Sequence, residues 1–334
     1  IGAVVFLLLD PMTLLFHQKF RDDVADQISN PLLGGSRPLW NANFRDVQPQ
    51  LYWFTNLLPW GIGPAFAVWG VAGVCWLVTR RTRLALAVAA YPLAYYAIAG
   101  QTITPFIRYS LPLIPGLAVA AGVLCGDLLR HPRWRRFGIA ATAVVVGSTA
   151  LYAAAYMNIY VRPDIRLQAS TLVSAMVPPG ASIVVEPSHN IPPTGKYLRE
   201  PDFYKDYVAW GSHMTRADQY VLHTLDVYRY LYDTNVPDAE KRRYIERRLA
   251  GADYILMDDT FVELYDHLSG AEHDVVSDYY DDLFSGRLGF QMVLHLKTSP
   301  RLFGFSINDE PAEFTFTLFD HPEIFLFKRT QPRS

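Results

Sequence analysis

Four uncharged apolar runs dominate the first half of the chain, and each is long enough to cross a bilayer. The runs are about Leu57–Thr79, Leu84–Ile107, Tyr109–Gly126 and Phe137–Val161. A membrane-spanning helix needs roughly 20 apolar residues, and a helix satisfies its own backbone hydrogen bonds in lipid. The pattern therefore predicts a polytopic α-helical membrane bundle with about four complete spans.

The chain opens within a further apolar run, Ile1–Leu9, which is too short to cross a bilayer. No basic residues precede this run, so it does not fit a secretory signal peptide. We interpret it as the end of a truncated span and expect more of the protein upstream of Ile1. Asp10 and Pro11 then favour a helix start. An amphipathic helix is expected in the external loop at 10–56, lying on the membrane surface or against the protein's own spans.

Short helices and strands follow Val161. The expected helices are Ile165–Val177, Pro237–Ala250 and Asp278–Phe284. The expected strands are Ser182–Glu186, Tyr254–Met257, Phe290–Leu296, Phe303–Ile307, Phe314–Phe319 and Ile324–Phe327. Early alternation of strand and helix, followed by several strands, is typical of a small α/β domain with a mixed sheet.

Charge divides the chain in the same way as hydrophobicity. Residues 1–160 carry 12 Lys or Arg and 6 Asp or Glu, whereas residues 161–334 carry 18 and 26. A nearly charge-free half and a charged half indicate two physical environments. We therefore expect a transmembrane region at 1–161 and an extracytoplasmic α/β domain at 162–334. The acidic second half gives no support to nucleic-acid binding.

Basic residues predict the orientation of the spans. Two clusters lie between successive runs: Arg80, Arg81 and Arg83, and then Arg130, Arg133, Arg135 and Arg136. Loops rich in basic residues remain in the cytoplasm, and both clusters fall on the same side. The protein is thus expected in the plasma membrane, with the loop at 10–56, the turn near Arg108 and the α/β domain outside the cytoplasm.

The two cysteines, Cys75 and Cys125, both lie in apolar runs. We expect them to be small buried side chains. Their number excludes a disulfide framework, and no spacing of metal-binding residues accompanies them.

The first candidate site is Arg108-Tyr109, at the outer end of a predicted span and followed by Pro112 and Pro115. A guanidinium binds phosphate through two parallel hydrogen bonds, and the prolines free backbone groups at the start of the helix. Arg108 is therefore either a phosphate ligand or an interfacial arginine whose side chain extends to water.

Carboxylates and histidines form weaker candidates. An external group of carboxylates could supply a general base, although a helix cap and a solvated face explain it better: Asp10, Asp22, Asp23 and Asp26. Glu186 and His189 follow a predicted strand and could bind a metal or a substrate. No third ligand stands at a useful spacing, which favours an ordinary surface loop.

The segment Phe106–Pro115, FIRYSLPLIP, resembles the RYxLPxxP stretch of bacterial polyprenyl-phosphate-dependent glycosyltransferases. These enzymes belong to the GT-C superfamily, with the protein mannosyltransferases and the aminoarabinose–lipid A transferases. Further similar segments lie in order along the chain, two before this one and four after it: 10–23, 56–63, 168–186, 252–255, 279–290 and 314–322. Relatives often carry EHWDD after the first strand, whereas this chain has Glu186-Pro187-Ser188-His189-Asn190, so no role is carried over to that loop.

The resemblance implies an integral-membrane glycosyltransferase that moves a sugar from a polyprenyl-phosphate carrier to a lipid, glycan or protein acceptor outside the cytoplasm. The catalytic carboxylates of the family lie in an N-terminal external loop, so we expect them upstream of Ile1 and expect the fragment alone to be inactive. Arg108 and Tyr109 are expected to bind the lipid phosphate, with Lys19 and Arg21 as weaker candidates. The only small molecule implied is the lipid-linked sugar donor; no cofactor or metal ligand is assigned, and the metal requirement stays open.

The alternative is a non-enzymatic membrane protein with an outer ligand-binding domain, such as a sensor or a transporter subunit. A transporter should carry ionisable residues within its spans, and only Asp127 lies near the end of one. A sensor should carry a cytoplasmic output domain, which the pattern does not contain.

Overall fold

The structure, a computed structural model, describes residues 15–23, 25, 39–186, 188, 190–192, 220–233, 235–266 and 274–330. The chain divides into two compact units. One unit comprises Ile1–Gly61 and Ala67–Gly138, and the other comprises Ile62–Phe66 and Ile139–Ser334.

Helices make up most of the chain up to Tyr160. Residues 17–23 are helical, while most of the expected amphipathic helix lies outside the described residues. The elements that follow are η1 (Leu39–Phe44), α4 (Pro49–Tyr52), η2 (Trp53–Leu57), α5 (Leu58–Ile62), α6 (Pro64–Arg80), α7 (Arg83–Ala99), η3 (Ile107–Ser110), α8 (Leu113–Arg130) and α9 (Arg135–Tyr160).

The expectation of a polytopic bundle with about four complete spans and a truncated one is wrong. In the part of the chain that the structure describes, two helical stretches are long and apolar enough to cross a membrane, Leu113–Arg130 and Arg135–Met176. The second stretch comprises α9 and continues into α10 (Ile165–Met176). Helices α6 and α7 have 17 residues each, or about 26 Å of helix, against a hydrocarbon core of about 30 Å.

Glycine interrupts the first two apolar runs. The run Leu57–Thr79 divides at Gly63, whose φ of +85° is readily adopted only by glycine. A Cβ at this position would also stand 3.3 Å from the ring of Tyr152. The run Leu84–Ile107 stops being helical at Gly100, and the residues that follow form turns. Both runs have enough apolar residues to cross a bilayer, but the helices within them are too short to do so.

Small residues and a charge pair hold α6 against α8. A Cβ at Gly73 would collide with the backbone of Ala120, so the two helices approach closely there. Seven residues further along each helix, Arg80 forms an ion pair with Asp127 at 3.0 Å. The indole of Trp76 donates to the same carboxylate at 2.8 Å. Helices α6 and α8 therefore run in the same direction.

Both cysteines are free thiols. The indole N–H of Trp69 lies 3.0 Å from the sulfur of Cys125. Cys75 is exposed, so the expectation that it is buried is wrong.

A mixed sheet of five strands forms the centre of the second unit, in the order β2-β1-β3-β7-β4. The strands are β1 (Ser182–Val185), β2 (Val221–Thr224), β3 (Tyr254–Asp258), β4 (Phe290–Leu296) and β7 (Ile324–Arg329). Strand β1 is parallel to β2 and β3, whereas β7 is antiparallel to β3 and β4. The residues after Val161 thus form the mixed sheet that their pattern predicts.

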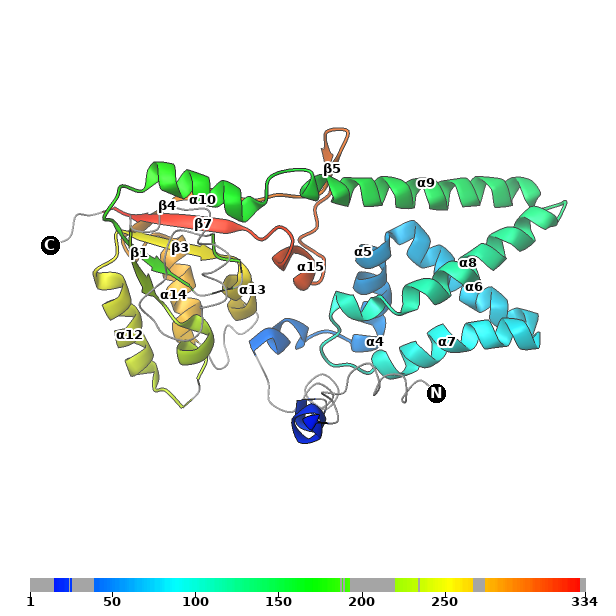
Figure 1. Cartoon of the computed structure of the whole chain (residues 1–334), viewed down its shortest axis with the longest axis horizontal. Helices are drawn as coiled ribbons and strands as arrows, with labels where there is room; N and C mark the ends of the chain where they lie inside the picture. The colour runs from blue at the N-terminus through cyan, green and yellow to red at the C-terminus, as the bar shows by residue number, and fades with distance from the viewer. Residues whose placement is uncertain are drawn as a thin grey trace. The chain divides into compact units, whose positions relative to one another are not determined.

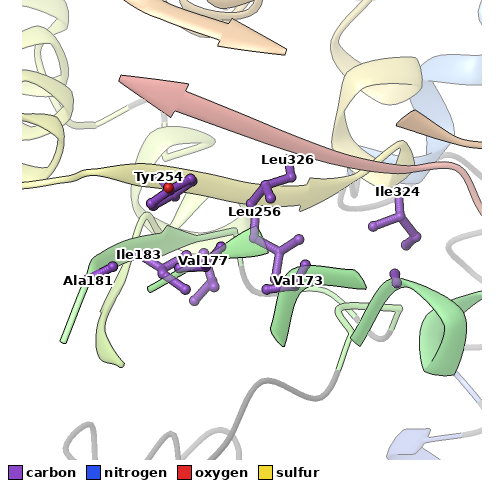
Figure 2. Close-up of a cluster of buried hydrophobic side chains, with 10 residues drawn as sticks. Val173, Val177, Ala181, Ile183, Tyr254, Leu256, Ile324 and Leu326 are labelled. Atoms are coloured by element: carbon purple, nitrogen blue, oxygen red, sulfur yellow. The ribbon is translucent and has the colours of Figure 1, made fainter. Parts of the chain in front are cut away.

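Helices cover both faces of this sheet. Helix α10 lies on one face, and α12 (Asp238–Ala250), α13 (Thr260–Asp266) and α14 (Asp274–Phe284) lie on the other (Figure 1). On the α10 face, Val173 packs with Ile183 and Leu256 in a buried cluster (Figure 2). On the opposite face, the ring of Phe284 meets the rings of Phe325 and Phe327 at 5.3 Å. Side chains alternate between the faces, as the pleat of a strand requires.

Two expected strands differ in the structure. The segment Phe314–Phe319 contains a short helix, α15 (Thr315–Leu318), because the carboxylate of Glu313 accepts the backbone N–H of Thr315 at 3.0 Å and so satisfies a helix-start donor. The segment Phe303–Ile307 forms part of a hairpin, with β5 (Arg301–Leu302) and β6 (Phe305–Ser306). Strand β2 and the π-helical turn η4 (Val227–Leu231) were not predicted.

Candidate functional site

The turn before α8 carries an exposed arginine on an aromatic support. The guanidinium carbon of Arg108 lies 4.2 Å from the centroid of the Phe106 ring and 5.4 Å from that of Tyr109. Phe106 is buried, with its ring edge-on to Phe44 at 5.3 Å. Within the described residues, no carboxylate pairs with this guanidinium. A guanidinium whose face rests on a ring keeps its N–H edge available for an anion.

Tyrosine hydroxyls from α7 hold the backbone of this turn. Tyr95 donates to the carbonyl of Tyr109 at 2.9 Å, and Tyr91 donates to the carbonyl of Pro112 at 2.8 Å. Such carbonyls are destabilising when they are left unpaired away from water. The two bonds therefore pair backbone carbonyls of this turn and join it to α7.

Tyr109 is half-buried beside the guanidinium. Its backbone carbonyl is paired, but no hydrogen bond is made by its hydroxyl in the region that the structure describes. The hydroxyl is thus available to donate to an anion held by Arg108.

The weaker phosphate-binding candidates, Lys19 and Arg21, lie in the helical stretch at 17–23 and are exposed. No described interaction joins either residue to Arg108, so the structure does not bring the four expected ligands together. Asp22 and Asp23 are also exposed on this stretch, which fits a solvated face. The other two carboxylates of that group, Asp10 and Asp26, lie outside the described residues.

A second polar cluster lies where the parallel strands β1 and β3 end. Glu186 follows β1 and is 1% exposed. Tyr279 and Tyr280 of α14 donate to its two carboxylate oxygens at 2.7 and 2.8 Å. The carboxyl edge of parallel strands is the usual place for a ligand in α/β domains, so this cluster is the second candidate site.

Burial gives Glu186 unusual acid–base behaviour. Burial raises the pKa of Glu186 to about 7; the tyrosine hydroxyls lower it and the nearby charge of Asp258 raises it. The carboxyl can therefore exchange a proton near neutral pH. Sequence reasoning treated Glu186 as part of a surface loop, and the structure corrects this, because α14 covers it.

Asp259 contributes a buried carboxyl to the same edge. It is 7% exposed, and one oxygen accepts the backbone N–H of Glu323 at 3.1 Å. The other oxygen, Oδ1, is buried and has no hydrogen-bond partner among the described residues. Burial, followed by the charge of Asp258, raises the pKa of Asp259 well above its usual value. A neutral carboxyl is therefore favoured here.

Polar side chains around Asp258 form hydrogen bonds with one another. The hydroxyl of Ser188 donates to Asp258, and the backbone N–H of Asn190 donates to Ser188 at 3.0 Å. The guanidinium of Arg166 donates to the side chain of Asn190 at 3.2 Å and pairs with Asp164 at 2.6 Å. Sequence reasoning missed this network; the pair of acidic residues at the end of strand β3, Asp258 and Asp259, was the signal that could have identified it.

Histidines do not assemble a metal site in the described part of the chain, where no group of three or more metal-ligating side chains is found. His189, which was considered together with Glu186 as a possible metal or substrate ligand, lies outside the described residues. His321 forms a buried pair with Asp309 at 2.7 Å.

Comparison with known protein families, with curated proteins and with solved structures gives no match to this chain. The relationship to GT-C glycosyltransferases therefore stays a prediction that rests on the sequence motifs. The geometry of the Arg108 turn is an independent observation, because it does not depend on any relative.

Proposed function

We propose that this protein is a membrane glycosyltransferase that moves a sugar from a polyprenyl-phosphate carrier to an acceptor outside the cytoplasm. The observation that carries the proposal is the exposed guanidinium of Arg108 on the ring of Phe106. The same turn lies in the motif Phe106–Pro115, which resembles a motif of such enzymes. Arrangement and motif thus favour the same ligand, a lipid-linked phosphate.

Helices α8 and α9 would attach the protein to the membrane. The apolar segment in the helical stretch that begins with α9 is only 6% buried within the protein. The core helix of a soluble protein, by contrast, is mostly buried. Four arginines lie at or between the adjoining ends of the two helices and favour a cytoplasmic location for this connection: Arg130, Arg133, Arg135 and Arg136. Helix α8 has 18 residues, so Arg108 would lie at the opposite surface, about 27 Å away.

The role of Arg108 follows from the charge that develops during transfer. As the bond between sugar and carrier breaks, the lipid phosphate becomes the leaving group and gains negative charge. A guanidinium that makes two parallel hydrogen bonds to phosphate oxygens stabilises this charge, and the hydroxyl of Tyr109 supplies a further donor. The general base that accepts the proton of the acceptor is not assigned to any residue of this sequence.

The test is transfer from a polyprenyl-phosphate sugar by membrane vesicles that contain the full-length protein. Arg108→Ala should lower the transfer rate about 100-fold or more, the size typical of losing one group that stabilises charge in the transition state. Arg108→Lys should retain part of the rate, because it keeps the charge but not the paired geometry. Arg133→Ala, an exposed arginine of the other cluster, is the matched control and should transfer normally.

Membrane insertion of each variant is measured by resistance to alkaline extraction. This control distinguishes a lower transfer rate from a smaller amount of inserted protein. Transfer by Arg108→Ala at the unmodified rate would remove the observation on which the proposal rests. An equal loss of transfer rate in Arg133→Ala would mean that transfer depends on positive charge in general and not on the turn around Arg108.

A non-enzymatic protein with an outer ligand-binding domain is the second candidate. One observation favours it: the buried oxygen of Asp259 has no described partner and lies at the carboxyl edge of the parallel strands. The two candidates differ in turnover. A binding protein would release no polyprenyl phosphate from any lipid-linked sugar, and its ligand affinity would fall in Asp259→Asn while Arg108→Ala left it unchanged.

A further inference from the structure

The hairpin formed by β5 and β6 presents two phenylalanines to solvent. The exposed fractions of Phe303 and Phe305 are 84% and 80%, the highest among the large hydrophobic side chains that the structure describes. The hairpin projects away from the five-stranded sheet of the same unit (Figure 1). Packing within the unit therefore does not explain why aromatic residues stand at this tip.

The backbone of the turn also disfavours phenylalanine. Leu302 pairs with Phe305, which leaves Phe303 and Gly304 as the two turn residues. Their φ values are +50° and +88°, the arrangement of a hairpin turn that prefers Asn followed by Gly. A bulky side chain at a positive φ is strained. Because the ring at 303 is both strained and exposed, its presence is better explained by a function than by folding.

The short helix α15, which follows the hairpin in the chain, packs on α9, a helix that is apolar enough to cross a membrane. The carbonyl of Pro300 accepts the N–H of Ile307 at 2.9 Å and closes the base of the hairpin. Further along the chain, the ring of Phe316 in α15 lies 4.9 Å from that of Tyr156 in α9. Tyr160, in the last turn of α9, is also exposed. Tyrosines near the end of a spanning helix are typical of the membrane–water interface.

The size of the tip favours lipid over a protein partner. Two phenylalanine side chains bury about 300–500 Å² together, less than the roughly 800 Å² that each partner buries in a standard protein interface. A narrow apolar tip with a cation at its base suits the boundary between headgroups and acyl chains. Arg301 supplies that cation: it is exposed and makes no ion pair with a described residue.

We infer that the tip Phe303–Phe305 inserts into the outer leaflet of the membrane, with Arg301 at the level of the lipid phosphates. The inference rests on the membrane attachment in the proposed function, but it needs no glycosyl transfer. The hairpin would serve as a second lipid contact that orients the sheet of its unit at the bilayer surface.

The experiment uses the full-length protein in vesicles of phosphatidylethanolamine and phosphatidylglycerol. The native thiols are removed by Cys75→Ala and Cys125→Ala, and one site at a time is replaced by cysteine and labelled with an environment-sensitive fluorophore. The test site is Phe305→Cys. The reference sites are Val144→Cys, in the apolar part of α9, and Glu246→Cys, an exposed position of α12. Nitroxide-labelled lipids quench from within the bilayer, and iodide quenches from water.

The label at position 305 should be quenched several-fold more by nitroxide lipids than by iodide, as at position 144, whereas position 246 should show the reverse. Strong iodide quenching at 305, with lipid quenching retained at 144, would overturn the inference and leave the membrane attachment standing. Protection of 305 from both quenchers would also overturn it, because protein would then cover the tip. Iodide quenching at 144 would contradict the membrane attachment itself.

Discussion

Arg108 depends on the aromatic ring beneath it. Phe106 places one face of the guanidinium against carbon and leaves the N–H edge open, and such a contact contributes about 0.5–1 kcal/mol at an exposed site. The ring also makes edge-on contacts with the rings of Phe44 and Tyr109. The affinity of this turn for phosphate should therefore respond to a residue that never touches the phosphate.

Phe106→Leu should weaken the binding of a short-chain polyprenyl phosphate about 2–5-fold, because the apolar volume stays while the ring is lost. Phe44→Leu removes a ring from the same cluster without removing the one under Arg108, and its affinity should be unchanged. Equilibrium binding to the full-length protein in detergent measures both. Equal affinities for the two variants would show that the ring does not support the cation.

Glu186 should make the stability of its unit depend on pH. Its pKa is about 7 in the folded protein, against an ordinary value of 4.5 for a glutamate in an unfolded chain. The fold thus favours the protonated form, so its stabilisation is complete below about pH 4.5 and is lost as pH rises through 7. The corresponding free energy is on the order of 3 kcal/mol. Asp259, whose pKa is also raised, acts in the same direction.

Glu186→Gln cannot ionise, so its unfolding free energy should fall less between pH 5 and pH 8.5 than that of the unmodified protein. Glu246→Gln, at an exposed position of α12, should keep the original dependence. Hydrogen exchange of peptides from β1 and β3 in the full-length protein, corrected for the intrinsic effect of pH, reports this quantity. A stability that rises over this interval in the unmodified protein would contradict the assigned pKa direction.

Helices α6 and α8 approach each other too closely at Gly73 for a larger residue. A Cβ at Gly73 would meet the backbone of Ala120, which cannot move aside as a side chain can. Gly73→Ala should therefore destabilise the unit by about 1–3 kcal/mol. Gly122→Ala in α8 is the matched control, because a Cβ there meets nothing within 4 Å; it should be neutral or stabilise by up to about 1 kcal/mol. Unfolding by a denaturing detergent measures both, and equal stabilities would mean that the helices are not in close contact.

Local patterns predicted most elements of the sheet-containing unit but not all of them. Strand β4 has the predicted bounds, and α10 ends one residue earlier than expected. The alternation of aromatic residues with threonine in Phe314–Phe319 predicted a strand. A single carboxylate, that of Glu313, changes this outcome by pairing with a backbone N–H. The pattern of apolar positions does not predict such a local hydrogen bond.

Contacts between distant residues explain what the sequence could not predict for the chain as a whole. Charge-free runs predicted about four spans, but the φ of Gly63 depends on the surrounding structure and shortens the first helix. Arg108 was identified from its position before a predicted span. The partners of Glu186 lie 93 and 94 residues away, and no spacing rule connects them, so the cluster at the strand ends appeared only in the structure.

The central claim is that the turn around Arg108 holds a lipid-linked phosphate, and photoaffinity labelling tests it most directly. Vesicles with the full-length protein are irradiated with a short-chain polyprenyl phosphate that carries a diazirine on its first isoprene unit, and the labelled peptide is identified by mass spectrometry. The label should fall within or beside Phe106–Pro115, be displaced by unlabelled polyprenyl phosphate, and be lost in Arg108→Ala. Labelling confined to other segments, or retained in Arg108→Ala, would contradict the claim.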